Sequence, residues 1–229
     1  MESLETEVRE GLIQKAAQAT YEVMQDPEYQ LLLRESVKAI DTFFVEPFGL
    51  KESDPELDAL LDESLETFFS NPDQLRLHAY KAARNQYLTR KRISLELEAL
   101  YGQLKHEENY ESLAAALTTA IEPLYPILDA RENVVRELVA LAEREGIEKA
   151  LTDEAEYAAI QKVFPTKEAY MNNQFGGVRA FEDFAVSVQE SLSKGEESDE
   201  NPSLRGLIRV LETVTRKEIL KKADAIYGA

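Results

Sequence analysis

Apolar residues recur at intervals of three and four along most of the chain, which is the spacing of helices that bury one face. This period predicts a first helix that ends before Asp26 and a last helix that begins after Pro202. No stretch alternates in the period of two that indicates a β-strand. The sequence therefore predicts an all-α fold, a multi-helix bundle of about eight to ten helices. The first stripe is Leu4, Val8, Leu12, Ala16, Ala19 and Val23, and the last is Leu204, Leu207, Ile208, Leu211, Val214, Ile219, Ala223 and Ile226.

Proline, glycine and capping residues predict where the helices begin and end. A short polar residue before proline favours a helix start, and glycine favours a helix end. The predicted starts are at Asp26-Pro27, Asp54-Pro55, Asn71-Pro72, Thr152, Thr166 and Asn201-Pro202, with a kink or restart at Pro123 and Pro126 and an end at Gly146. Between Pro72 and His106 there is no further proline and the only glycine is Gly102. This gap predicts one long central helix over about 72–106.

The helices are expected to form a single domain over 1–229, with 123–126 as the place of any subdivision. A chain of 229 residues is long enough to bury a substantial core. The segment 194–201 is charged and poor in apolar residues, which predicts a mobile acidic loop. Segments 26–36 and 54–64 resemble each other, and we interpret this as a shared capping signature rather than a repeat, because no third copy is visible.

The composition narrows the classes of function. The chain has no cysteine, so disulfides, thiolate nucleophiles and cysteine-ligated metals are excluded. Its start is acidic and lacks an apolar leader, and no long apolar run occurs, so a cytoplasmic protein without a membrane segment is expected. The net charge of −18 disfavours nucleic acid as a partner, because phosphate backbones are bound mainly through Lys and Arg.

No motif indicates a metal, a cofactor or a catalytic residue. The two histidines, His78 and His106, lack the Glu-x-x-His context of di-iron bundles. Nucleophile and phosphate-binding motifs are also missing. The sequence therefore predicts no cofactor and no metal site. It leaves the question of enzymatic activity open, with a non-enzyme favoured.

A basic stretch interrupts the acidic background. Between Gln74 and Ser94 no acid occurs, and the candidate binding cations there are Arg84, Arg90, Lys91 and Arg92. The stretch fits two interpretations: an exposed surface for a phosphate backbone or an acidic partner, or a central strut packed on two sides. Apolar residues on both sides of the helical wheel favour the strut. We expect residues 90–92 to remain exposed in either case.

The segment MNNQFGGVRAF, 171–181, contains the only Gly-Gly pair. Two glycines in a helix interior cost about 2 kcal/mol, yet the seven-residue apolar repeat continues through them in phase. This combination predicts a helix that is kinked or briefly broken near 173–177, or a point where a neighbour packs closely. The candidate hinge or close-contact residues are Asn172, Asn173, Phe175, Gly176, Gly177 and Arg179.

Three classes of function remain compatible with these features. The favoured one is a non-enzymatic helical protein-interaction module: an adaptor, an assembly factor or a subunit of a complex, with a protein partner. The second is a component of a nucleic-acid-handling complex that uses the basic stretch 76–92. The third is a small-molecule binder or enzyme with a pocket between helices. A homo-oligomer is compatible with all three.

Overall fold

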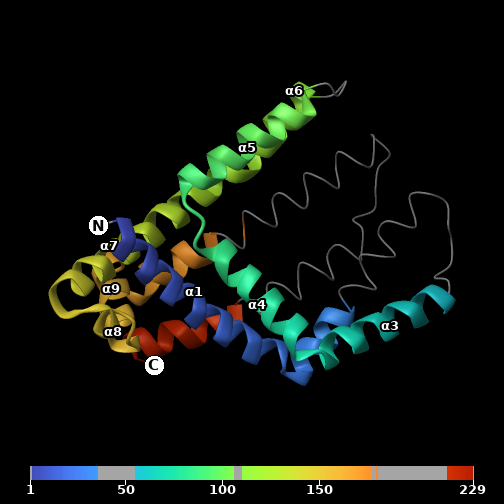
Figure 1. Ribbon diagram of the computed structural model, residues 1–229, viewed down its shortest axis with the longest axis horizontal. Coiled ribbons are helices and arrows are strands. Elements are labelled where there is room, and N and C mark those ends of the chain that lie inside the picture. The colour runs from blue at the N-terminus through green and yellow to red at the C-terminus, as the bar shows by residue number, and fades with distance from the viewer. Residues whose placement is uncertain (1, 36–54, 106–109, 177–178, 180–215, 229) are drawn as a thin grey trace. The chain divides into compact units, whose positions relative to one another are not determined.

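Helices account for the regular structure throughout the part of the chain described by the computed structural model, residues 2–35, 55–105, 110–176, 179 and 216–228 (Figure 1). No strand occurs in these ranges, which confirms the predicted all-α, multi-helix class. The helices are α1 (Glu2–Met24), 27–35, α3 (Pro55–Ser70), α4 (Pro72–Gln86), α5 (Arg90–Leu104), α6 (Tyr110–Ile121), η2 (Glu122–Leu124), α7 (Tyr125–Glu145), α8 (Ile147–Ala150), α9 (Asp153–Val163), 167–176 and 216–227. The acidic segment 194–201 lies outside the described residues.

Most predicted helix boundaries are confirmed, and two of the helix starts have a threonine cap. The Thr152 hydroxyl accepts a hydrogen bond from the Ala155 amide at 3.2 Å, and Thr166 accepts one from the Ala169 amide at 3.1 Å. Gly146 follows the end of α7 with φ at 92°, a backbone conformation that favours glycine. Between α6 and α7 the chain restarts at Pro123 and Pro126, as predicted. Threonine side chains therefore cap two of these helix starts, while glycine and proline mark the other boundaries through the backbone.

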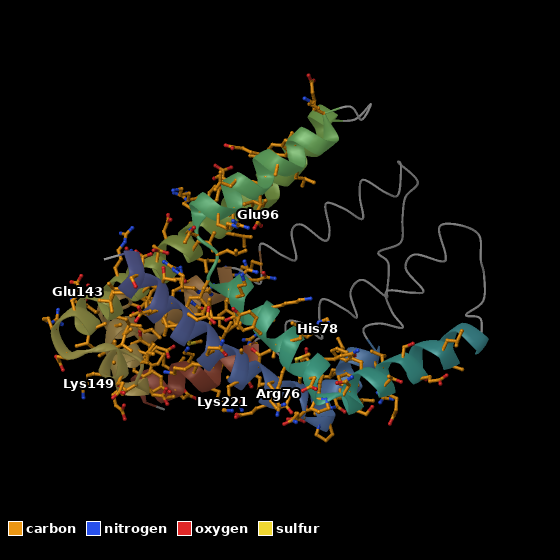
Figure 2. All side chains as sticks on the ribbon, viewed as in Figure 1. Arg76, His78, Glu96, Glu143, Lys149 and Lys221 are labelled. Carbon is orange, nitrogen blue, oxygen red and sulfur yellow. The ribbon has the colours of Figure 1, made fainter. Side chains whose placement is uncertain are left out.

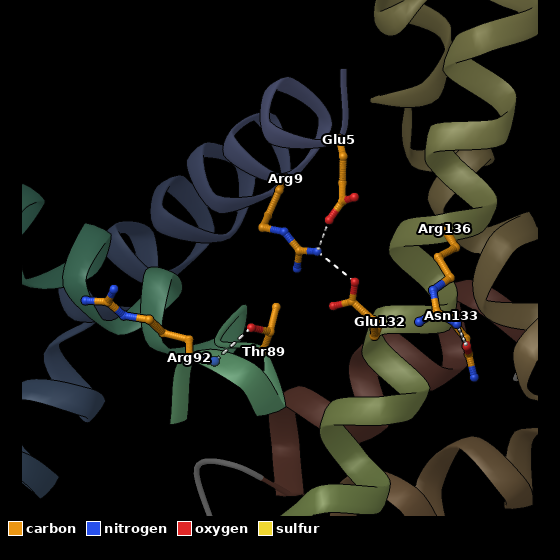
Figure 3. Close-up of polar contacts among 7 residues, drawn as sticks. All are labelled: Glu5, Arg9, Thr89, Arg92, Glu132, Asn133 and Arg136. Carbon is orange, nitrogen blue, oxygen red and sulfur yellow. Dashed lines mark hydrogen bonds and ion pairs between the residues drawn. The ribbon is translucent and has the colours of Figure 1, made fainter. Parts of the chain in front are cut away.

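The predicted long central helix over 72–106 is wrong, because two helices occupy this segment. The first, α4, ends at Gln86, and α5 begins at Arg90 after three residues that are not helical. The Thr89 hydroxyl accepts a hydrogen bond from the Arg92 amide at 3.2 Å and caps the new helix (Figure 3). A threonine cap therefore starts a helix here without the proline or glycine that usually marks such a break.

The chain groups into two compact units. Unit 1 comprises Met1–Ile13, Arg84–Phe184 and Ile219–Ala229, and unit 2 comprises Gln14–Ala83 and Ala185–Glu218. The segment 123–126 lies inside the long continuous part of unit 1, and a subdivision of the chain there stays a prediction.

In unit 1 the main core forms around α7. Val135, Leu138 and Ala142 of α7 are buried against Val8 and Leu12 of α1, together with alanines from α8 and α9. Beside this core, Arg9 of α1 donates hydrogen bonds to Glu5 at 2.9 Å and to Glu132 of α7 at 2.8 Å (Figure 3). Burial alone would lower the pKa of Arg9, but these two carboxylates outweigh it and raise the pKa.

A second core in unit 1 holds residues of the last helix. Ile219, Ala223 and Ile226 are buried against Ile160 and Tyr170, which confirms the C-terminal part of the predicted apolar stripe. Polar contacts flank this core: Lys222 with Glu156 at 2.7 Å, Gln161 with the Ile226 carbonyl at 2.6 Å, and Tyr227 with the Phe164 carbonyl at 2.6 Å. The C-terminal helix is thus attached by both apolar burial and specific polar contacts.

In unit 2 the described core is smaller. Met24, Leu75 and Ala79 are buried, and the side chains of Tyr21, Tyr29, Phe68 and Phe69 pack against them. The Asn71 side chain accepts hydrogen bonds from the Asp73 and Gln74 amides and caps α4, as predicted from Asn71-Pro72. These contacts fix the start of the helix that leads into the basic stretch.

Gly11 of α1 is the position where a missing side chain matters for packing. A Cβ placed there would lie 2.4 Å from Cδ1 and 3.2 Å from Cγ of Leu151. The terminal methyl groups of Leu151 would therefore have to move, and its branch point would have to shift by a few tenths of an ångström. We expect Gly11→Ala to destabilise unit 1, although alanine gains about 1 kcal/mol of helix propensity over glycine.

A double-mutant cycle tests this packing, with the free energy of unfolding from urea titration as the readout. In the Leu151→Ala background the steric conflict is gone, so Gly11→Ala should become stabilising by up to about 1 kcal/mol. Gly102 is the matched control, because a Cβ there meets nothing within 4 Å. Gly102→Ala should stabilise in both backgrounds. The same sign for Gly11→Ala in both backgrounds would contradict the close approach.

Candidate functional site

The four predicted cations of the basic stretch lie in unit 1, where α4 ends and α5 begins. Of the four predicted cations, Arg84 lies in the last turn of α4, and Arg90, Lys91 and Arg92 form the first turn of α5. All four are exposed. The structure therefore places the predicted residues on neighbouring turns of two helices rather than along one continuous helix.

Arg90 is held in an internal contact. Its guanidinium carbon lies 4.2 Å from the centre of the Tyr125 ring, and Nη1 lies 3.3 Å from the Asp129 carboxylate. Both partners are on α7. Arg90 remains 52% exposed, as predicted, but its charge is already paired. We therefore assign it to anchoring α5 rather than to binding a partner.

Arg84 and Lys91 have no ion pair with any described residue, whereas Arg92 pairs with Glu96 of its own helix at 2.8 Å. Glu96 lies one turn further along α5 (Figure 2). Leu95 follows Lys91 by four residues and Arg92 by three, so it shares their side of the helix, and it is 50% exposed. We call Arg84, Lys91, Arg92 and Leu95 the basic corner. It combines positive charge with an exposed apolar side chain.

The favoured interpretation of the basic stretch as a strut packed on two sides holds for one side only. Leu75 and Ala79 of α4 are buried, but Leu77 is 52% exposed and Leu95 is 50% exposed. Only one ion pair between described residues joins the stretch to another helix, Arg90 with Asp129. The remaining cations are surface groups, which supports the alternative interpretation.

The C-terminal part of α5 is held against α6. In Figure 1 the two helices run side by side, and the Tyr101 hydroxyl lies 2.9 Å from the Thr118 hydroxyl and donates to the Ala114 carbonyl at 3.2 Å. Ile93, Leu97 and Leu100 are half-buried along α5. This seam orients the helix, so that Lys91, Arg92 and Leu95 lie on the exposed side.

The predicted hinge is helical where it is described. Residues 167–176 form one helix, so no break occurs within 173–176, and Gly177 lies outside the described residues. Asn172 is exposed, Asn173 is half-buried, and Phe175 packs against the core around Ile160 and Tyr170. The apolar contact of Phe175 offsets the weak helix propensity of its neighbours.

The predicted close contact at the glycine pair is an ordinary one at Gly176. A Cβ added to Gly176 would lie 3.9 Å from Ile127 Cδ1, a normal van der Waals distance, so this position does not require glycine. Arg179 is exposed. The described part of the segment therefore brings no group of side chains together as a site.

Metal and membrane sites find no support in the described residues. His78 is exposed on α4 (Figure 2), and the centre of its ring lies 4.9 Å from that of Phe68 in an edge-to-face contact. His106 lies outside the described residues. Among the side chains described, no three His, Asp or Glu residues gather as metal ligands. None of the described helices is both long and apolar enough to cross a membrane.

Arg131 of α7 is the contact residue that sequence reasoning missed. Its guanidinium donates a hydrogen bond to the Gln86 carbonyl, at the end of α4, and lies 5.8 Å from the centre of the Tyr87 ring. In the sequence Arg131 stands between Asp129 and Glu132, where an arginine is typical of a solvated helix face. No local signal distinguishes it from Arg136, so only the tertiary contact identifies it.

No protein family, no curated protein and no solved structure matches this chain.

Proposed function

We propose that the chain is a helical protein-interaction module and that its basic corner binds an acidic, partly apolar segment of a partner protein. One observation carries the proposal: Lys91, which has no ion pair with any described residue, shares a side of α5 with the exposed Leu95. A missing ion pair alone does not mark a site, because Arg136 and Arg144 of the same unit also have none with a described residue. Cations beside an exposed apolar side chain, however, form a surface complementary to an acidic helix or strand.

The apolar component favours a protein over a nucleic acid. A single exposed leucine is common on protein surfaces and carries no argument alone. Beside Lys91 and Arg92, however, Leu95 offers area that an amphipathic acidic peptide can bury and a phosphate backbone cannot. Duplex binding also draws its affinity from roughly six to ten phosphate contacts, more than three cations supply. A nucleic-acid partner is therefore the alternative outcome of the test.

The remaining alternatives rest on no particular contact. A small-molecule site or an enzyme would need convergent polar groups in a pocket. A homo-oligomer would use the same surface only if it met an acidic face of a second copy. A cytoplasmic location remains a prediction of the sequence.

Charge reversal of the basic corner tests the proposal. The probe is a fluorescein-labelled 21-residue peptide of Leu and Glu in heptads, titrated by anisotropy at low salt. We expect the triple variant Arg84→Glu/Lys91→Glu/Arg92→Glu to bind at least about tenfold more weakly than the wild type, because like charges then face each other. The matched control, Arg136→Glu/Arg144→Glu/Lys149→Glu, changes the net charge equally elsewhere in unit 1 and should bind within about twofold of the wild type.

Two further probes separate the classes of partner. A peptide with Gln in place of Glu should bind weakly, because the charge complementarity is gone. A single-stranded RNA of similar charge should bind less tightly than the Leu/Glu peptide. Tighter binding of RNA that the triple variant abolishes would overturn the proposal in favour of nucleic acid. Equal losses in the triple variant and its control would show that the corner is not the site.

A further inference from the structure

The connection between α4 and α5 is held at its first end by a residue of α7. The last carbonyls of a helix have no partner within the helix, and Gln86 is the last residue of α4. Arg131 of α7 donates to the Gln86 carbonyl, and its guanidinium carbon lies 5.8 Å from the centre of the Tyr87 ring. One side chain thus satisfies the end of α4 and contacts the first residue beyond it.

The other end of the connection is held by the same helix. Arg90, the first residue of α5, lies over Tyr125 and pairs with Asp129. Asp129 and Arg131 are two residues apart on α7, so the three-residue connection is attached to one short stretch of one helix. Between the two anchors, Thr89 fixes the first turn of α5 through the Arg92 amide (Figure 3).

The surroundings of Arg131 make its contact specific. Desolvation by burial lowers the pKa of Arg131, an effect opposed by Tyr87 and Tyr170. No carboxylate of the described residues forms an ion pair with it. A partly desolvated guanidinium without an acid depends on the few acceptors and rings that it reaches, here the Gln86 carbonyl and Tyr87. Displacing the connection would therefore leave Arg131 poorly solvated, which opposes that movement.

We propose that Arg131 is a positioning residue that fixes the connection between α4 and α5 against α7 and so preorganises the basic corner for its acidic partner. The inference rests on the proposed function. Arg84 lies before the connection, and Lys91, Arg92 and Leu95 lie after it. If residues 87–89 were free to change conformation, Arg84 would lose its fixed position relative to the other three. Binding would then have to supply the cost of ordering them.

Two substitutions of Arg131 test the inference. Arg131→Met removes the donor and the charge at similar length, and Arg131→Lys keeps the charge but loses the planar fork. In the free protein, amide hydrogen exchange at residues 87–92 should accelerate about tenfold or more in both variants, because the connection opens more often. Arg136→Met is the matched control. Arg136 is an exposed arginine on the same helix that donates a hydrogen bond to Asn133 at 3.3 Å (Figure 3), and its removal should leave exchange at 87–92 unchanged.

The salt dependence of binding distinguishes positioning from direct contact. Affinity of both Arg131 variants for the Leu/Glu peptide should fall about five- to tenfold. The slope of affinity against salt should stay that of the wild type, because the contacting cations remain. Arg84→Gln/Lys91→Gln should instead flatten the slope, since two contacting charges are lost.

The outcomes separate this inference from the proposed function. If the wild type binds no peptide, the proposed function fails, while hydrogen exchange still decides whether Arg131 fixes the connection. Unchanged exchange at 87–92 in the variants would overturn the proposal that Arg131 fixes the connection. Faster exchange together with wild-type affinity would overturn the role of Arg131 in binding. If Arg131→Met melts unit 1, as circular dichroism would show, Arg131→Lys decides both points.

Discussion

Leu138→Ala is expected to lower the free energy of unfolding by about 3 kcal/mol, within the range found for buried leucines. Leu138 has no exposed surface and lies at the centre of the unit 1 core. The same cluster contains Val8 and Leu12 of α1 and four buried alanines of α7, α8 and α9. The methyl group of an alanine is fixed to the helix backbone and cannot move into a void, so the cavity left by Leu138→Ala would remain largely unfilled. The loss of stability should therefore exceed the transfer free energy of the removed methyl groups.

Urea titration followed by circular dichroism and by tyrosine fluorescence measures this loss. Two probes are needed because the chain forms two units and a single transition cannot be assumed. Leu95→Ala is the control, since this leucine is half exposed in the same unit and should cost less than about 1 kcal/mol. A loss for Leu138→Ala no larger than that of the control would contradict the described packing.

Contacts between residues close in the sequence explain why the helix class and most helix ends were predictable. Thr152, Thr166 and Gly146 act through hydrogen bonds or φ values that involve only the next few residues. Such contacts are encoded within a short window of sequence, and tertiary structure does not need to supply them. These helix boundaries are therefore predictable from the sequence, because their physical cause is local.

The break at residues 87–89 was missed because its cause is partly tertiary. The segment from Asn85 to Leu88 contains no helix breaker, and Thr89 by itself is tolerated inside helices. The guanidinium of Arg131, 45 residues away in the sequence, takes the Gln86 carbonyl that a continuing helix would have used. A contact over that separation leaves no periodic signal, which is why one long helix was predicted.

The apolar stripe of α1 shows a second limit of periodicity. Val8 and Leu12 are buried as predicted, but Ala19 is exposed, and Ile13, Ala17 and Met24 are buried in later turns. Steps of four residues drift by about 40° per step around a helix of 3.6 residues per turn. The buried face therefore changes along α1, whose residues up to Ile13 belong to unit 1 and whose later residues belong to unit 2.

The cations of the candidate site were predictable from the sequence, but the ion pairs that they form were not. Arg84, Arg90, Lys91 and Arg92 stand out in an acidic chain from the sequence alone. The contact of Arg90 with Asp129 and Tyr125 of α7 is one that the sequence does not indicate. The structure therefore reassigns Arg90 to anchoring, whereas Arg84 and Lys91 form no ion pair with any described residue.

Tyr170 is expected to make the protein lose stability between about pH 10 and pH 12. Burial, with Glu156 adding to it, raises the pKa of Tyr170 to about 12, while Arg131 acts in the opposite direction. In the unfolded chain the phenol ionises near its ordinary value of 10.0. The unfolded state therefore releases the proton first, so the stabilising contribution is complete below pH 10 and is lost as the pH rises to about 12. Two pKa units correspond to a loss on the order of 2–3 kcal/mol.

Tyr170→Phe isolates this effect in urea titrations at several values from pH 9 to pH 12. Lysines and the other tyrosines also titrate there, and burial raises the pKa of Tyr227 as well, so the wild type and the variant both lose stability. The variant should lose less, because it lacks the one phenol whose neutral form the core most strongly favours. The difference in unfolding free energy between the two proteins should grow steadily above pH 10. Parallel curves would show that Tyr170 ionises as readily in the folded protein as in the unfolded chain.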